Sequence, residues 1–371
     1  MEQRLLEQAI GAAGRPVSAE PFGEGRIVRF LVEDGQDRGD WFVDTSRQAV
    51  PAETGFVIRD RDGRTIARIW KHPLDPRLPA LRTVLDPERL IRIAAAAGST
   101  GEIDGRVLAY RPGRRAVVRL TQHDTHLFVK VVRPGEAEDL AEIHRACRAA
   151  GVPAPEVVHW TPAGVVVVRD ADGTAGPVAA TRMSADDLLD AVDALREQLL
   201  RVQTRRIARP SVGTRLAWHL DRLTTALPER EHEIAQLRPA LSPHLKRDGQ
   251  PKAVHGDLHI GQLFFTDGTV SSVIDVDTAG LGDQCDDTAA FIGHATASAV
   301  RNEVAGRASD AALLHTLAEV AADRWMQQPH TAALTSLHLI GHAIRAVDRS
   351  REAAGLLLDE ALDLQRIRRA R

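Results

Sequence analysis

The sequence has only two cysteines, no long apolar run and little net charge. Cys147 and Cys285 are too few for a disulfide scaffold, and neither has a second cysteine nearby to form a zinc pair. No segment is apolar enough over its length to span a membrane, and charged and polar residues interrupt residues 1–10, unlike a secretory signal. A net charge of -3 argues against a nucleic-acid partner. We therefore expect a cytoplasmic protein without a membrane or nucleic-acid partner.

The length and the apolar content set the size of the fold. The chain has 371 residues, more than one ordinary domain, so two lobes with a cleft are expected. A hydrophobic content of 43% is sufficient for packed cores. The sequence shows no internal repeat and no low-complexity segment.

The most informative stretch begins with His255-Gly256-Asp257 and ends with Ile274-Asp275-Val276-Asp277. Residues 266–269 (Thr-Asp-Gly-Thr) form a turn sequence between two apolar runs, which predicts a hairpin. The hairpin would bring Gln262 near Asp275. An amide oxygen and a carboxylate are hard-oxygen ligands of the kind that Mg²⁺ takes beside waters and phosphates. Asp257 then lies free upstream, where it would accept or orient the proton of an attacking hydroxyl.

Taken singly, each of these residues has an ordinary structural explanation, since an Asp or His in a loop is usually a cap or a solvated turn residue. The combination of His-Gly-Asp, Gln262 and Ile-Asp-x-Asp after a hairpin favours phosphoryl transfer. His255 is expected to hold the loop by packing and hydrogen bonds, not to act as a base. His259 either touches the substrate or fills the loop.

These motifs resemble the aminoglycoside phosphotransferase and choline kinase-like superfamily of small-molecule kinases. The matching residues are His255, Gly256, Asp257, Gln262, Asp275, Asp277, Gly282, Asp283 and Asp287. The resemblance implies an α+β, two-lobed protein-kinase-like fold with a mixed N-terminal lobe and a mainly helical C-terminal lobe. It implies that Asp257 is the catalytic carboxylate, that Gln262 and Asp275 hold Mg²⁺, and that Asp277 assists the metal or the substrate. Asp287 and Asp283 would instead brace the catalytic loop and the start of a helix.

The family usually has Asn where this sequence has Gln262. Gln occurs in maltokinase-like and glucosamine kinase-like relatives, so the departure favours sugar substrates. A second function of the acidic residues around Asp275 would be to attract a cationic or polyhydroxylated acceptor.

A kinase also needs a nucleotide-binding part upstream. Residues 106–111, 115–121 and 127–132 read as three strands, and Lys130 in the third is the expected contact to the α- and β-phosphates. The following helix, residues 136–150, offers Glu138 and Glu142 as partners of Lys130, and the family's spacing favours Glu142. The turn between the first two strands would face the phosphates with its backbone and with Arg114 and Arg115. It lacks the Gly-x-Gly-x-x-Gly pattern, so a plain surface hairpin is an equal alternative.

Three parts follow along the chain. Residues 1–100 form a cap-like segment with a helix near residues 2–12, strands near 26–32, 41–43, 55–59 and 65–70, and a helix started by Asp86-Pro87. Residues 101–173 form the nucleotide-binding lobe, closed by a buried valine strand (165–168) and a hinge. Residues 174–371 form the helical lobe, with core leucine stripes and helices over 287–298, 310–327, 332–348 and 351–367.

The sequence therefore predicts an ATP- and Mg²⁺-dependent kinase that phosphorylates a hydroxyl of a small sugar, amino sugar or aminoglycoside. The alternative is a nucleotide-binding pseudokinase or regulatory module. Trp325, His338 and His342 are the polar-tipped residues of the helical lobe to inspect for acceptor contacts, although each is more often a core residue. The identity of the acceptor, the choice of ATP or GTP and the oligomeric state stay open.

Overall fold

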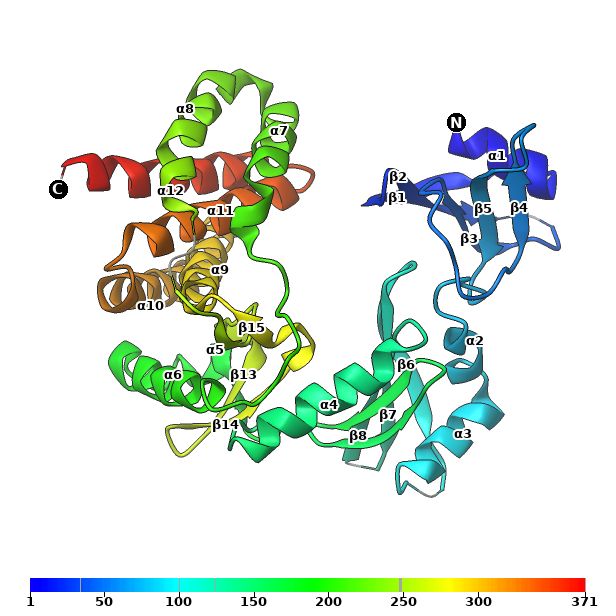
Figure 1. Cartoon of the computed structure of the whole chain (residues 1–371), viewed down its shortest axis with the longest axis horizontal. Coiled ribbons are helices and arrows are strands. Elements are labelled where there is room, and N and C mark those ends of the chain that lie inside the picture. The colour runs from blue at the N-terminus through cyan, green and yellow to red at the C-terminus, as the bar shows by residue number, and fades with distance from the viewer. Residues whose placement is uncertain (34, 100, 124, 247–248, 371) are drawn as a thin grey trace. The chain divides into compact units, whose positions relative to one another are not determined.

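The computed structural model describes residues 1–33, 35–99, 101–123, 125–246 and 249–370, the last five by their backbone only (Figure 1). The chain forms two units. Unit 1 contains Met1–Glu142 and Glu156–Asp170, and unit 2 contains Ile143–Pro155 and the chain from Ala171 onward. The expected α+β, two-lobed fold is confirmed. The finer division at residues 100 and 173 stays a prediction, and residue 100 lies outside the described residues.

Unit 1 begins with a helix and a five-stranded antiparallel sheet, the N-terminal sheet, in the order β1-β2-β3-β5-β4. The helix packs Leu6 against apolar residues of β2, β3 and β5. The predicted helix and four strands are confirmed. Strand β1 was not predicted, because it carries two prolines and is exposed over most of its length. The elements are α1 (Glu2–Ile10), β1 (Arg15–Phe22), β2 (Gly25–Val32), β3 (Gly39–Asp44), β4 (Phe56–Arg59) and β5 (Thr65–Lys71).

The second sheet of unit 1 has the strand order β6-β7-β8-β10-β9. Strand β10 lies between β8 and β9, and its four valines are buried, as the unbroken valine run predicted. Asp86 caps α3 by accepting a hydrogen bond from the backbone N–H of Arg89 at 3.1 Å. The elements are α2 (Ala80–Val84), α3 (Pro87–Ala96), β6 (Asp104–Arg111), β7 (Arg115–Gln122), β8 (Thr125–Val131), α4 (Glu136–Ala149), β9 (Val157–Thr161) and β10 (Val165–Arg169).

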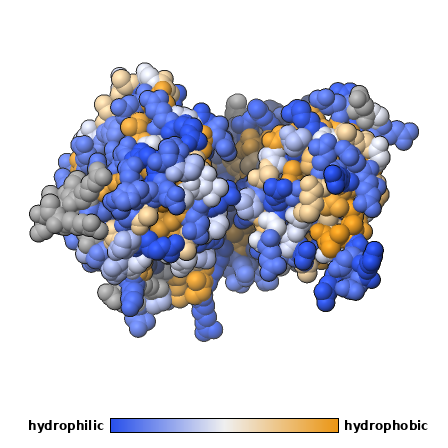
Figure 2. All heavy atoms as spheres, turned by 90° about the horizontal axis from the view of Figure 1, so that it is seen from above, coloured by the Kyte–Doolittle hydropathy of each residue, from blue (hydrophilic) through white to orange (hydrophobic). Residues whose placement is uncertain are grey.

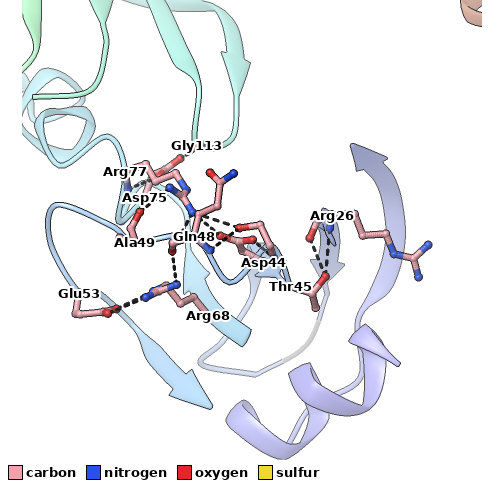
Figure 3. A network of polar contacts seen from close by, with 11 residues as sticks. Arg26, Asp44, Thr45, Gln48, Ala49, Glu53, Arg68, Asp75, Arg77 and Gly113 are labelled. Atoms are coloured by element: carbon pink, nitrogen blue, oxygen red, sulfur yellow. Dashed lines mark hydrogen bonds and ion pairs between the residues drawn. The ribbon is translucent and has the colours of Figure 1, made fainter. Parts of the chain in front are cut away.

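A buried aspartate joins the two sheets of unit 1 (Figure 3). Asp75 follows the N-terminal sheet, and its Oδ2 accepts hydrogen bonds from the Gly113 N–H at 2.7 Å and the Tyr110 hydroxyl at 2.8 Å, both at the β6–β7 turn. Its Oδ1 accepts the backbone N–H of Arg77 at 2.8 Å, and the Arg77 guanidinium lies 3.4 Å from the buried Asp44 carboxylate. The turn of the second sheet is therefore held by the N-terminal sheet.

Unit 2 is mainly helical. Helices α9 and α11 pack against α7, α8 and α12 around Leu223, Leu237, Leu337 and Leu357, and all four predicted C-terminal helices are confirmed. The helices are α5 (Gly176–Ala179), α6 (Ala185–Leu199), α7 (Leu216–Ala226), α8 (Glu231–Leu241), α9 (Gln284–Val304), α10 (Ala308–Trp325), α11 (Pro329–Ala346) and α12 (Arg351–Ala370). The short strands are β11 (Thr174–Ala175), β12 (Lys252–Val254), β13 (Leu263–Thr266), β14 (Thr269–Val273) and β15 (Gly280–Gly282).

Hydrophilic residues cover most of the face seen in Figure 2, and apolar residues appear there in small groups. None of the helices within the described ranges combines the length and the apolar character that crossing a membrane requires.

Candidate active site

The loop after β12 is braced by a buried carboxylate at the start of α9. The Asp287 side chain accepts hydrogen bonds from the backbone N–H groups of His255 at 2.8 Å and Gly256 at 2.7 Å. Burial raises the pKa of Asp287, and these hydrogen bonds oppose that rise. The His255 ring is buried and its Nε2 lies 3.0 Å from the Ile274 carbonyl oxygen. Both contacts agree with the expected bracing role of Asp287 and with His255 as a loop-holding residue.

Glycine is required at position 256 by the path of the backbone. Gly256 has φ +82°, and a Cβ there would lie 2.6 Å from the Thr278 carbonyl oxygen. That oxygen accepts the backbone N–H of Arg209 at 2.9 Å, so it is fixed from the other side. The tight turn places Asp257 directly after the braced residues.

Asp257 is held as a carboxylate by basic neighbours. The Arg209 Nη1 donates to its Oδ2 at 2.7 Å, and the His294 Nε2 lies 3.7 Å from its Oδ1. Burial acts to raise the pKa of Asp257, but His294 and Arg209 outweigh it and hold the pKa well below its usual range. An ionised carboxylate with a defined orientation is what a group that receives a hydroxyl proton requires.

The predicted hairpin β13–β14 forms and brings the two predicted metal ligands to its open end. The Ile274 N–H donates to the Gln262 carbonyl oxygen at 2.9 Å, and Asp275 follows in a left-handed conformation with φ 59°. The side-chain Oε1 of Gln262 is buried and has no hydrogen-bond partner within the described part of the chain. A buried amide oxygen without a partner is costly unless a ligand satisfies it, so this donor set fits a hard cation.

Asp277 has other neighbours. The His144 Nε2 lies 3.4 Å from its Oδ1, and Arg206 donates to its carbonyl oxygen at 2.5 Å. Its assistance to the metal or the substrate stays a prediction.

The predicted nucleotide-contacting residues lie in unit 1. Lys130 is buried near the end of β8, paired with Val117 and Val166 of the neighbouring strands. Glu138 and Glu142 are exposed on α4, and Arg115 is half-buried at the start of β7. The Arg114 guanidinium donates to the Pro21 carbonyl oxygen at 3.0 Å and lies 5.1 Å from the centre of the Phe22 ring. Their contacts to a nucleotide stay predictions.

A cavity of about 460 Å³ adjoins Asp257 within unit 2. The loop before α7 and the helices α7, α9 and α11 contribute residues that line it, including His219, His294, His338 and His342. The His294 ring stacks on His259 with centroids 4.2 Å apart and meets His342 edge-on at 4.4 Å. Burial lowers the pKa of His338 to about 3, so that this ring is neutral.

Two of the three residues that the sequence marked for acceptor contacts line the cavity, and the third, Trp325, does not. His338 and His342 line the cavity, whereas the Trp325 Nε1 donates to Asp193 at 3.2 Å and its ring packs edge-on against Phe291. Sequence reasoning missed Arg209 and His294. His294 lies two helical turns after Asp287 on α9, and this spacing was a usable signal. Arg209 had none, because a loop far away in sequence supplies it.

Comparisons with known proteins extend these observations. A model of the phosphotransferase enzyme family matches residues 108–326, more than half of the chain. No curated protein has a significant sequence match to it. A thermostable mutant of aminoglycoside phosphotransferase APH(4)-Ia, in a ternary complex with AMP-PNP and hygromycin B, is 14% identical, with a TM-score of 0.52 over 75% of this chain and 97% of that one. Another structure of APH(4)-Ia is 13% identical, with a TM-score of 0.52 over 74% and 96%.

Proposed function

This chain belongs to the phosphotransferase enzyme family, and from that premise we propose that it is an ATP- and Mg²⁺-dependent small-molecule kinase. The acceptor is a hydroxyl of a small polyhydroxylated compound, for which sugars, amino sugars and aminoglycosides are the starting classes. The observation that carries the proposal is the ionised Asp257, fixed by a braced loop in the wall of a cavity large enough for a sugar.

The reaction joins the acceptor oxygen to the γ-phosphorus while the bond from that phosphorus to the β–γ bridging oxygen breaks, and ADP leaves. Asp257 orients the acceptor hydroxyl and receives its proton. Arg209 and His294 keep this carboxylate ionised and limit its rotation, so they position the base without touching the reacting atoms.

Gln262 and Asp275 are the residues that would hold Mg²⁺, with Asp277 as the assisting carboxylate. The partnerless buried Oε1 of Gln262 supports this assignment. The bound ion would neutralise phosphate charge. In unit 1, Lys130 would contact the α- and β-phosphates, with Glu142 as its proposed partner and with Arg114 and Arg115 as further phosphate contacts.

The test is acceptor-dependent ADP release by the purified full chain with Mg²⁺, comparing Asp257→Asn with the parent. We expect kcat to fall at least about 100-fold, the range contributed by one positioned acid–base group, with nucleotide affinity almost unchanged. Asp267→Asn is the matched control, because Asp267 is an exposed aspartate in the hairpin turn. Unchanged turnover in Asp257→Asn would refute the assignment of the base. Nucleotide binding without acceptor-dependent turnover in the parent would favour the regulatory alternative.

A further inference from the structure

The cavity beside Asp257 is lined mainly by positive charge. Among the described residues, five arginines and two aspartates line it. The aspartates are Asp257, which is paired with Arg209, and Asp286, whose Oδ1 accepts a hydrogen bond from the Ser211 hydroxyl at 2.5 Å. Burial also raises the pKa of Asp286 to about 6. The arginines are Arg209, Arg215, Arg301, Arg345 and Arg349.

Three of these arginines have no carboxylate partner among the described residues. Arg209 forms an ion pair with Asp257, whereas Arg215, Arg301 and Arg349 form no ion pair with any described residue. Arg301 donates to the Ser298 hydroxyl, which carries no charge. Burial and the neighbouring Arg349 guanidinium lower the pKa of Arg301, because two positive charges lie close together.

The geometry of α11 gathers this charge on one face. His338, His342 and Arg345 follow one another on α11 at spacings of four and three residues, so they lie along the same side of the helix, and Arg349 in the turn after α11 lines the same cavity. The Arg345 Nη2 lies 3.2 Å from the His342 Nδ1. Burial lowers the pKa of His342, and the nearby His294, Arg345 and Arg301 side chains lower it further. The His342 ring that lines the cavity is therefore neutral.

Helix dipoles compensate only part of this charge. Arg301 lies in the last turn of α9, Arg345 lies in the last turn of α11, and Arg349 follows in the turn after α11. Each helix end carries a partial charge of about -0.5, which is less than the charge of the arginines gathered there. A cluster of like charges around a cavity favours an anion, and guanidinium groups bind carboxylates and phosphates in a two-pronged geometry.

We propose that the acceptor is an anion, a polyhydroxylated compound that carries a phosphate or a carboxylate group, which the arginines of this cavity bind while its hydroxyl meets Asp257. This inference rests on the proposed kinase function and narrows its substrate class. A polycationic aminoglycoside would meet like charges in the same cavity, so the structure favours sugar phosphates and sugar acids over amino sugars and aminoglycosides.

The first experiment measures kcat/KM for four acceptors of similar size, glucose, glucosamine, glucuronate and glucose 6-phosphate, with kanamycin as a polycation. We expect an anionic acceptor to be preferred at least about tenfold, with a KM that rises with ionic strength. The two anions distinguish a carboxylate from a phosphate. Preference for a neutral or cationic acceptor would overturn the inference while leaving the kinase function in place.

Variants test the arginines directly. Arg215→Gln and Arg349→Gln, each alone and then together, should raise KM for the preferred anion by about 10- to 100-fold with a smaller change in kcat, as expected for lost charge-assisted hydrogen bonds. The kcat/KM for glucose, which carries no anionic group, should fall less than that for the preferred anion. Arg238→Gln is the matched control, because Arg238 is an exposed arginine on α8 outside the cavity lining. If the arginines only cap helices, the variants lower stability equally and leave selectivity as in the parent, which would refute the inference.

A binding measurement separates the two proposals. Calorimetric titration of the full chain with glucuronate or glucose 6-phosphate reports occupation of the cavity without chemistry. Binding that the double variant loses, together with absent turnover, would support the anion site and refute the kinase. No binding of either anion would overturn the inference whatever the turnover.

Discussion

Gly256→Ala is the substitution that most sharply tests how the catalytic loop is built. An alanine at φ +82° takes a left-handed conformation that costs about 1–2 kcal/mol. Its Cβ would also lie 2.6 Å from the Thr278 carbonyl oxygen, a separation that real Cβ atoms do not tolerate. The carbonyl must then move away from the Arg209 N–H, which adds about 1 kcal/mol for the lost hydrogen bond.

The same movement reaches the proposed base from two sides. Asp257 is the next residue along the chain, and its ion-pair partner Arg209 loses a backbone anchor. A misplacement of about 1 Å in a catalytic group can cost about 100-fold in rate. We therefore expect Gly256→Ala to lose about 2–3 kcal/mol of stability and about 100-fold in kcat.

A glycine with the same left-handed backbone but no close neighbour separates the effect of the Thr278 contact from the cost of the left-handed conformation. Gly306 follows α9 with φ +72°, and a Cβ there would meet nothing within 4 Å. Gly306→Ala therefore carries the conformational cost alone. Denaturant unfolding and steady-state kinetics on both variants give the comparison. If Gly256→Ala is as stable and as active as Gly306→Ala, the reasoning about the Thr278 contact is wrong.

Two further predictions concern metal binding and pH. Asp275→Ala should raise the Mg²⁺ concentration for half-maximal activity by at least about tenfold, because even residues that only hydrogen-bond to a metal ligand cost about that much metal affinity when they are replaced. A Mg²⁺ titration equal to that of the parent would count against the ligand role. His330 lies 3.0 Å from Asp283, the N-cap of α9, and this contact raises the pKa of His330 above 6.5 and lowers that of Asp283 below 3.8 despite opposing burial. The contribution of this ion pair to the folding stability is therefore complete between pH 3.8, above which Asp283 is ionised, and pH 6.5, below which His330 is charged. The contribution disappears as the pH rises through the raised pKa of His330. His330→Gln should cost about 1–2 kcal/mol in denaturant unfolding at pH 5.5 and almost nothing at pH 9, and a pH-independent difference would show that the charge is irrelevant.

The parts of the fold that the sequence predicted are those with a strong local pattern. The valines of β10, the leucine stripes of unit 2 and the Asp86-Pro87 helix start each carry their own signal, and each is confirmed. Strand β1 has no such pattern, because its neighbour β2 supplies the pairing that makes it a strand.

The site divides in the same way. The approach of Gln262 and Asp275 was predictable because the β13–β14 hairpin joins them, and Asp257 lies in the same short stretch; their catalytic and metal-binding roles stay predictions. The arginines of the cavity come from the segment before α7, from α9, and from α11 with the turn after it, and only the packing of unit 2 brings them to one cavity. The sequence alone did not show that these arginines share one cavity, and the aspartates around residue 285 suggested a cationic or polyhydroxylated acceptor.

Because the buried Asp75 accepts hydrogen bonds from the β6–β7 turn, the N-terminal sheet and this turn can be exchanged between proteins only together. A chain shortened past residue 75 would leave the Gly113 N–H and the Tyr110 hydroxyl facing a space with no acceptor, and it would separate Arg77 from the Asp44 carboxylate. A chimera with its crossover between residues 75 and 113 would meet the same mismatch unless both parents supplied the same partners. The N-terminal sheet is therefore not an exchangeable appendage, and any graft of the second sheet must carry it along.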